Sequence, residues 1–199
     1  MTSLLAISAS PSARSRTAAV AAHLLRRLSR ADFRTAHLRV RDLPAADLLA
    51  GRTDGPAMRQ ALDAVAAADG VLVATPVYQA AYSGLLKTFL DVLPRSGLAG
   101  KTVLPVMTGG SLAHALAPTY ALQPVLAALG ARHVVRGAFV LDRSVGVDDD
   151  GRPLVSGDAV PRLDRALEEF VAALPPKELS ASGALCAGLF GDPAVPRAY

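Results

Sequence analysis

Residues 71–91 read VLVATPVYQAAYSGLLKTFLD, and this stretch decides the fold class. The short, largely β-branched apolar run from Val71 to Ala74 predicts a buried strand that stops at Thr75-Pro76. A loop follows, and after Ser83-Gly84 the spacing of the apolar residues predicts an amphipathic helix. Strand, turn and helix in this order build the ligand sites of open α/β sheets, at the carboxyl ends of the strands. The turn holds neutral and aromatic side chains rather than acidic ones, which points to a flat ligand that stacks, and first to a flavin.

The same alternation continues along the rest of the chain. Apolar runs predict further strands, and periodic segments predict helices. The strands are expected at 4–9, 33–40, 101–108 and 133–141, the helices at 17–30, 56–68, 84–93, 112–129 and 160–174, and loops at 42–54 and 143–157. Five strands alternating with five helices indicate a parallel sheet covered on both faces, for which the strand order 2-1-3-4-5 is the simplest. We therefore expect a three-layer α/β/α domain.

Length and composition limit the classes of protein that fit. The 199 residues, 51% of them hydrophobic, suit one domain over residues 1–174, followed by a Gly/Ala/Pro-rich tail over residues 175–199. No apolar run approaches the roughly 18 residues of a membrane span, and the N-terminus lacks the charge order of a secretory signal. The single cysteine, Cys186, leaves no internal disulfide and suits a reducing cytoplasm. The net charge of +4 is scattered, without the Lys/Arg runs of a nucleic-acid-binding protein.

The loop after the first strand is rich in hydroxyl groups and leads into a helix. Ser10, Ser15 and Thr17 would converge with backbone N–H groups at that helix N-terminus, where the macrodipole attracts a phosphate. Arg14 and Arg16 would add charge-assisted hydrogen bonds. Because the loop contains no glycine, it is neither a dinucleotide fingerprint nor a Walker A loop, and a monophosphate fits better. An ordinary capped helix with surface arginines is the alternative.

Two further loops would complete a site at the same edge of the sheet. Pro76 would fix the backbone beside Val77 and Tyr78 as a platform for a planar ring. The segment Thr108-Gly109-Gly110 ends the next strand, and its glycines would allow close approach of a ring, although a plain turn is the alternative. A helix dipole supplies at most roughly 2 kcal/mol, whereas micromolar affinity needs about −8 kcal/mol, so ring contacts must contribute.

These motifs together resemble the NADPH-dependent FMN reductase family. The resemblance is carried by Ser10-Pro11, Ser15-Arg16-Thr17, Ala74-Thr75-Pro76-Val77-Tyr78, Tyr82-Ser83-Gly84, Leu86-Lys87, Leu90-Asp91, Thr108-Gly109-Gly110, Ala113-His114, Tyr120-Ala121-Leu122 and Pro124-Val125-Leu126. It is strongest to the reductase component of two-component alkanesulfonate monooxygenase systems. It covers about residues 4–174 and leaves the tail outside.

The resemblance implies a flavodoxin-like fold, FMN as ligand, and hydride transfer to FMN from NADPH or NADH. By matched motif, a first group of residues would hold the FMN phosphate, a second would border the isoalloxazine ring, and a third would flank that ring. These groups are Ser10, Ser15, Arg16 and Thr17; Pro76, Val77 and Tyr78; and Thr108, Gly109 and Gly110.

The resemblance also implies subunit contacts and a partner protein. Such reductases often assemble as homodimers or homotetramers through the helix after Gly84 and the helix that carries Tyr120, and the closest ones supply reduced flavin to a monooxygenase. Tyr82, Lys87 and Asp91 are therefore expected at an interface. For Lys87 and Asp91, which are four residues apart on a helix, an ordinary surface ion pair is the alternative.

The predicted helix at 112–129 contains Pro118 and Pro124, which a regular helix does not tolerate. Pro124 would leave the carbonyl of Tyr120 unpaired, and a π-bulge can absorb such a defect. In the similar sulfonate-system reductases a tyrosine insertion at this position makes a bulge, associated with flavin that dissociates as a substrate. We carry that role over to Tyr120 as a hypothesis. A simple proline kink with Tyr120 packed in an interface is the alternative.

The proposed chemistry needs no catalytic side chain, because the two cofactors carry the reaction. The four histidines show no metal-ligand spacing, and the acidic turn at 148–151 lacks the pattern of a calcium loop, so no metal site is predicted. Two other activities remain open from the residues. One is a quinone or azo-dye reductase with tightly bound FMN, and the other is a flavodoxin-like electron carrier.

Overall fold

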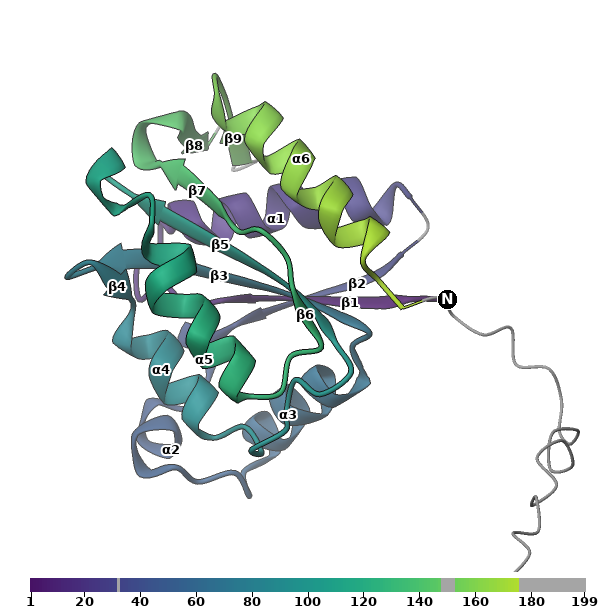
Figure 1. Cartoon of the computed structure of the whole chain (residues 1–199). Coiled ribbons are helices and arrows are strands. Elements are labelled where there is room, and N and C mark those ends of the chain that lie inside the picture. The colour runs from purple at the N-terminus through teal and green to yellow at the C-terminus, as the bar shows by residue number, and fades with distance from the viewer. Residues whose placement is uncertain (32, 148–152, 176–199) are drawn as a thin grey trace, which may run out of the picture.

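The chain folds into three layers, with a parallel sheet between two layers of helices (Figure 1). The computed structural model describes residues 1–31, 33–147 and 153–175. The strands lie in the order β2-β1-β3-β5-β6, and β7 also pairs with β5. Their bounds are Ser3–Ser8 (β1), Arg34–Arg39 (β2), Gly70–Tyr78 (β3), Thr102–Gly109 (β5), His133–Val134 (β6) and Ala138–Leu141 (β7). This is the predicted flavodoxin-like order, with β6 and β7 together in the place of the fifth strand.

Helices cover both faces of the sheet, as the alternating pattern predicted. Helices α1 (Arg16–Ser29) and α6 (Ala159–Ala172) pack on one face, where Leu24 and Phe170 are buried. Phe89 is buried on the opposite face, which is covered by α3 (Pro56–Ala67), α4 (Gly84–Asp91) and α5 (Gln123–Ala128). Because both faces of β1, β3 and β5 are buried, these strands are continuous apolar runs rather than alternating ones.

Strand β3 is longer than predicted, and the expected turn at Thr75-Pro76 is wrong. The strand continues because Pro76 still pairs with Thr108 of β5, where a proline can accept a hydrogen bond through its carbonyl. The chain turns only at Gln79-Ala80, into the short antiparallel strand β4 (Ala81–Tyr82). The predicted platform therefore projects from the sheet as a hairpin (Figure 1).

The strand predicted at 133–141 is two pieces rather than one. β6 pairs with the start of β5 and β7 with its end, so the ladder is interrupted opposite Pro105. Pro105 has no N–H to donate. The position facing it is Gly137, where a Cβ atom would lie only 2.9 Å from Pro105 Cγ. The proline in β5 thus explains both the break and the glycine.

The helix predicted at 112–129 is also interrupted. It consists of the 3-10 turn η2 (Leu112–His114), the π-helical segment η3 (Pro118–Leu122) and α5. The Gln123 N–H donates to the Pro118 carbonyl five residues back, which confirms the expected π-bulge. Gly130 follows with a φ of +79°, as a helix-ending glycine should.

The two predicted loops contain short regular elements. The loop at 42–54 follows the 3-10 turn η1 (Val40–Asp42) and holds α2 (Ala45–Ala50), and the loop at 143–157 holds η4 (Asp142–Ser144), β8 (Val145–Val147) and β9 (Pro153–Val155). These elements are too short for their periodicity to show in the sequence. The acidic turn at 148–151, Cys186 and nearly all of the predicted tail lie outside the described residues.

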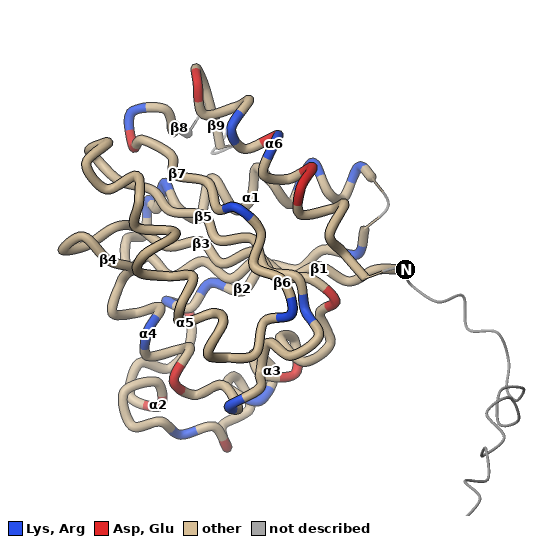
Figure 2. Tube along the Cα trace, in the orientation of Figure 1, with Lys and Arg blue, Asp and Glu red and all other residues tan. Residues whose placement is uncertain are grey.

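Charged residues of both signs occur in most parts of the fold (Figure 2). Lysines and arginines are scattered over helices and loops, with acidic residues among them (Figure 2). In the part of the chain that the structure describes, no helix is both long enough and apolar enough to span a membrane.

Candidate functional site

The loop between β1 and α1 forms a polar helix N-terminus. Ser15 is the N-cap of α1, and its Oγ accepts a hydrogen bond of 3.0 Å from the Ala18 N–H. Ser10 is buried, and its Oγ accepts a bond of 3.3 Å from the Ser12 N–H. Arg16 is exposed in the first turn, which contains no acidic residue. The N–H groups of that turn have no partner within the helix, so the loop has the donors and the sign of charge that a phosphate requires.

Thr17 plays a different part from its neighbours. Its Oγ1 lies 2.7 Å from Thr108 Oγ1, and both side chains are buried. The structure therefore brings together two predicted site residues that are 91 positions apart. This bond joins the loop between β1 and α1 to the end of β5.

A buried hydrogen-bond network joins the same loop to the hairpin. Ser83 Oγ donates to the Ala9 carbonyl at 2.6 Å and accepts from the Leu86 N–H at 3.1 Å, so it also caps α4. Thr75 Oγ1 lies 3.2 Å from Ser83 Oγ and accepts from the Ser83 N–H at 3.0 Å. Sequence reasoning missed these roles of Thr75 and Ser83. The Ser-Gly pair before a helix signals the cap, but nothing in the sequence pairs it with Ala9.

The predicted ring platform lies at the tip of β3. Pro76 is buried, Val77 is half-buried, and Tyr78 is 47% exposed. The hairpin then turns through two non-glycine residues with positive φ, Gln79 at +48° and Ala80 at +62°. Residues other than glycine seldom adopt this region, and such strain gathers at binding sites. The hairpin therefore presents one exposed aromatic ring on a constrained backbone.

The two glycines after β5 have different surroundings. A Cβ atom at Gly109 would lie 3.1 Å from Phe139 Cζ and 3.5 Å from Val77 Cβ, so this position is tightly packed inside the protein. At Gly110 the nearest atom to such a Cβ would be Asp142 Oδ2, at 4.0 Å. Gly110 is exposed, and its backbone is open to a ligand from outside. Sequence reasoning missed Phe139, which supports this loop from β7.

The residues predicted at an interface or in flavin exchange come from β4, α4 and η3, and η3 contacts β4 and β5. Tyr120, in η3, is 74% exposed. Leu116, which precedes η3, is 64% exposed. Tyr82, in β4, is half-buried against the core on the α4 side of the sheet. Lys87 Nζ lies 2.6 Å from Asp91 Oδ1 on the exposed side of α4. This hydrogen bond raises the pKa of Lys87. These contacts are those of a surface ion pair, and the structure of one chain does not assign them an interface role.

One histidine lies near the phosphate loop. His37 Nε2 is 2.9 Å from the Oγ of Ser8, the last residue of β1. Burial lowers the pKa of His37, and the nearby Arg39 lowers it further. Within residues 1–31, 33–147 and 153–175, no cluster of His, Cys, Asp and Glu side chains could hold a metal ion.

Comparisons with known proteins bear on the family of the chain. Residues 2–146 match the family model described as NADPH-dependent FMN reductase. The chain is 43% identical over 171 residues to an FMN reductase (NADPH) of Escherichia coli K12, covering 86% of this chain and 89% of the relative. It is 44% identical over 172 residues to an FMN reductase (NADPH) of Pseudomonas putida KT2440, covering 86% and 87%. A solved apo structure of an NADH:FMN oxidoreductase is 42% identical, with a TM-score of 0.81 over 89% of this chain and 92% of that one.

Proposed function

The chain belongs to the NADPH-dependent FMN reductase family and transfers hydride from NADPH or NADH to FMN, and we propose that the reduced FMN then leaves for a separate monooxygenase. The proposal assigns the phosphate of FMN to the N-terminus of α1, where Ser10, Ser15, Arg16 and Thr17 would hold it. It assigns the ring to the space between the hairpin at Tyr78 and the open backbone at Gly110. The donor set, free of acidic groups, fits this ligand.

The chain's own residues bind and orient rather than exchange protons. When bound, FMN supplies the ring that accepts the hydride. In this proposal, the backbone N–H groups around Gly110 would stabilise the negative charge that develops at the edge of the reduced ring. The Thr17–Thr108 bond and the Ser83 network hold the three loops in place before the ligand arrives. We therefore propose no general base in this site.

The observation that carries the release of flavin is the π-helical segment η3 with its exposed Tyr120. A π-turn is an irregularity that stabilises a helix poorly and is often found at functional sites. Here it lies on the same side of the sheet as α4, in contact with both β4 and β5, next to the loops assigned to the ring. We propose that Tyr120 favours dissociation of flavin, and that it does so within a homodimer or homotetramer in a reducing cytoplasm.

The test is a titration of the purified protein with FMN while NADPH oxidation is followed. The proposal expects a colourless protein whose turnover depends on added FMN and saturates. A yellow protein that keeps its flavin through dialysis would instead support a quinone or azo-dye reductase, and failure to oxidise NADPH with added FMN would support an electron carrier.

A variant tests the role of Tyr120 separately. We expect Tyr120→Ala to retain FMN during purification and to lose most of its turnover with added FMN. Leu49→Ala, at an exposed apolar position in α2 outside the proposed site, serves as the control. If Tyr120→Ala is as colourless as the wild type and keeps its full turnover, the role assigned to Tyr120 is wrong.

A further inference from the structure

A basic groove runs along the outer edge of β7. It has a volume of about 620 Å³ and lies between the chain around η3 and the exposed side of α6. Three arginines line it, Arg136 from the β6–β7 connection and Arg162 and Arg165 from α6. Leu116 and Pro118 give it an apolar side. Guanidinium groups beside an apolar wall suit a ligand that carries both a phosphate and a flat base.

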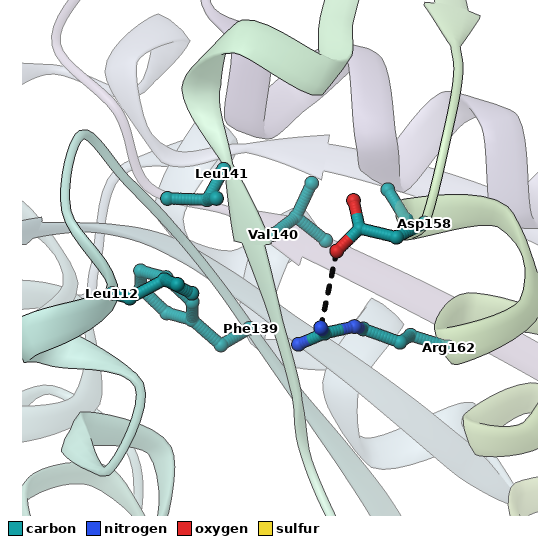
Figure 3. Close-up of a pocket in the computed structure, with 7 residues that line it drawn as sticks. Leu112, Phe139, Val140, Leu141, Asp158 and Arg162 are labelled. Atoms are coloured by element: carbon teal, nitrogen blue, oxygen red, sulfur yellow. Dashed lines mark hydrogen bonds and ion pairs between the residues drawn. The ribbon is translucent and has the colours of Figure 1, made fainter.

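The groove opens next to the proposed flavin site. A small pocket lined by Leu112 and Leu141 adjoins it, and both share Phe139, Asp158 and Arg162 (Figure 3). The ring of Phe139 is the group that a Cβ atom at Gly109 would meet at 3.1 Å. Phe139 therefore packs against the loop after β5 at Gly109 and also lines the groove.

The three arginines differ in their partners. Arg162 Nη2 donates to Asp158 Oδ2 at 3.0 Å, and both residues of this pair also line the small pocket (Figure 3). Arg136 and Arg165 form no ion pair with any residue in the described ranges, although Glu169 also lines the groove. Two guanidinium groups are thus available to an anion at the end farther from the flavin loops.

We infer that this groove binds the adenosine half of NADPH and that Arg136 and Arg165 recognise its 2′-phosphate. The inference rests on the proposed function, because the nicotinamide must stack on a flavin ring held at Gly110 and Tyr78. Leu141 lies five residues after Arg136, or about 17 Å along an extended chain, which an extended dinucleotide can span. The 2′-phosphate, which NADPH has and NADH lacks, would bind to the guanidinium groups of Arg136 and Arg165.

Kinetics with the two nucleotides at saturating FMN test the inference. For Arg136→Gln combined with Arg165→Gln, we expect kcat/KM for NADPH to fall about tenfold or more, the effect of losing charge-assisted hydrogen bonds. The value for NADH should change less than about twofold, because no 2′-phosphate is present. Arg34→Gln is the matched control, since Arg34 is an exposed arginine at the opposite edge of the sheet. It should leave both values unchanged.

A binding measurement gives a readout independent of turnover. Calorimetry on the flavin-free protein should show that adenosine 2′,5′-bisphosphate binds more tightly than 5′-AMP, and that the double variant loses the difference. Equal losses for NADPH and NADH, or no preference for the bisphosphate, would overturn the inference. So would a change in the size of the assembly with unchanged nucleotide preference, since the groove would then be an interface between copies. A wild-type protein inactive with either nucleotide would contradict the proposed function, whereas the bisphosphate measurement would still judge the groove.

Discussion

The two regions around the proposed flavin site are built in opposite ways. The loops after β1, β3 and β5 are joined by buried hydrogen bonds between side chains distant in sequence, such as Thr17 with Thr108. The neighbouring segment 112–122 has an irregular backbone and exposes Leu116 and Tyr120. Buried polar groups are costly unless they are satisfied, so the first region has one stable arrangement. We propose that the loops after β1, β3 and β5 hold the flavin rigidly, whereas segment 112–122 changes conformation when ligands or subunits bind.

The largest expected effect comes from removing Ser83, which holds the rigid region together. Ser83→Ala leaves the Ala9 carbonyl without this donor, takes a partner from Thr75, and removes the cap of α4. We expect a loss of about 2–3 kcal/mol in the free energy of unfolding, and weaker FMN binding. Urea unfolding measures the first, with the exposed Ser96→Ala as control. A loss no greater than that of Ser96→Ala would show that the network does not stabilise the site.

A double-mutant cycle tests the next contact in size. Thr17→Val leaves the buried hydroxyl of Thr108 without its partner, and we expect it to cost about 1–2 kcal/mol. Thr17→Val combined with Thr108→Val should cost less than the sum of the two single changes, because no orphaned hydroxyl remains. Additive losses in urea unfolding would mean that the two hydroxyls stabilise the protein independently.

Relieving backbone strain should sharpen the comparison in the opposite direction. Ala80 has a φ of +62°, a conformation that glycine adopts without penalty. We expect Ala80→Gly to raise the melting temperature through a gain of roughly 0.5–1 kcal/mol. The control is Ala81→Gly, one residue on in β4, which should lower it. If both changes lower the melting temperature, the hairpin is not strained at Ala80.

The smallest expected effect is a dependence of stability on pH. Burial lowers the pKa values of His23 and His37 in the folded state. As the pH falls from about 7 toward 5, the unfolded chain binds protons that the folded chain binds less readily, so folding stability should decrease. His37→Gln should reduce the change of unfolding free energy with pH, and His23 should account for the part that remains. The control is His133→Gln, at an exposed histidine. An unchanged slope in His37→Gln would contradict the assignment.

The sequence predicted the layers and the strand order because these follow from hydrophobic periodicity. It also predicted the π-bulge, because the defect arises from a local residue, Pro124, whose missing N–H can be placed by counting. The sequence did not predict strand boundaries that depend on residues distant along the chain. The break between β6 and β7 depends on Pro105 in a neighbouring strand, and the extension of β3 depends on pairing with β5.

The candidate site divides in the same way. The cap at Ser15 depends on local sequence, because a serine stands directly before the first helical residue. Gly109 was predicted from the sequence to make room for a ligand, and the structure adds that Phe139 of β7 packs tightly against the same position. No pattern in the sequence marks a packing contact between residues 30 positions apart, so only the folded chain separates the two glycines into an internal one and an open one.

The central claim is that FMN dissociates from a rigid site next to the irregular segment 112–122. Its most direct test is the rate at which FMN dissociates. Stopped-flow displacement of bound FMN by an excess of a second flavin gives this rate, which is compared with kcat for NADPH oxidation. The account predicts that FMN leaves at least as fast as the enzyme turns over, so that each cycle can deliver reduced flavin. Dissociation much slower than kcat would show that FMN stays as a bound cofactor and would contradict the account.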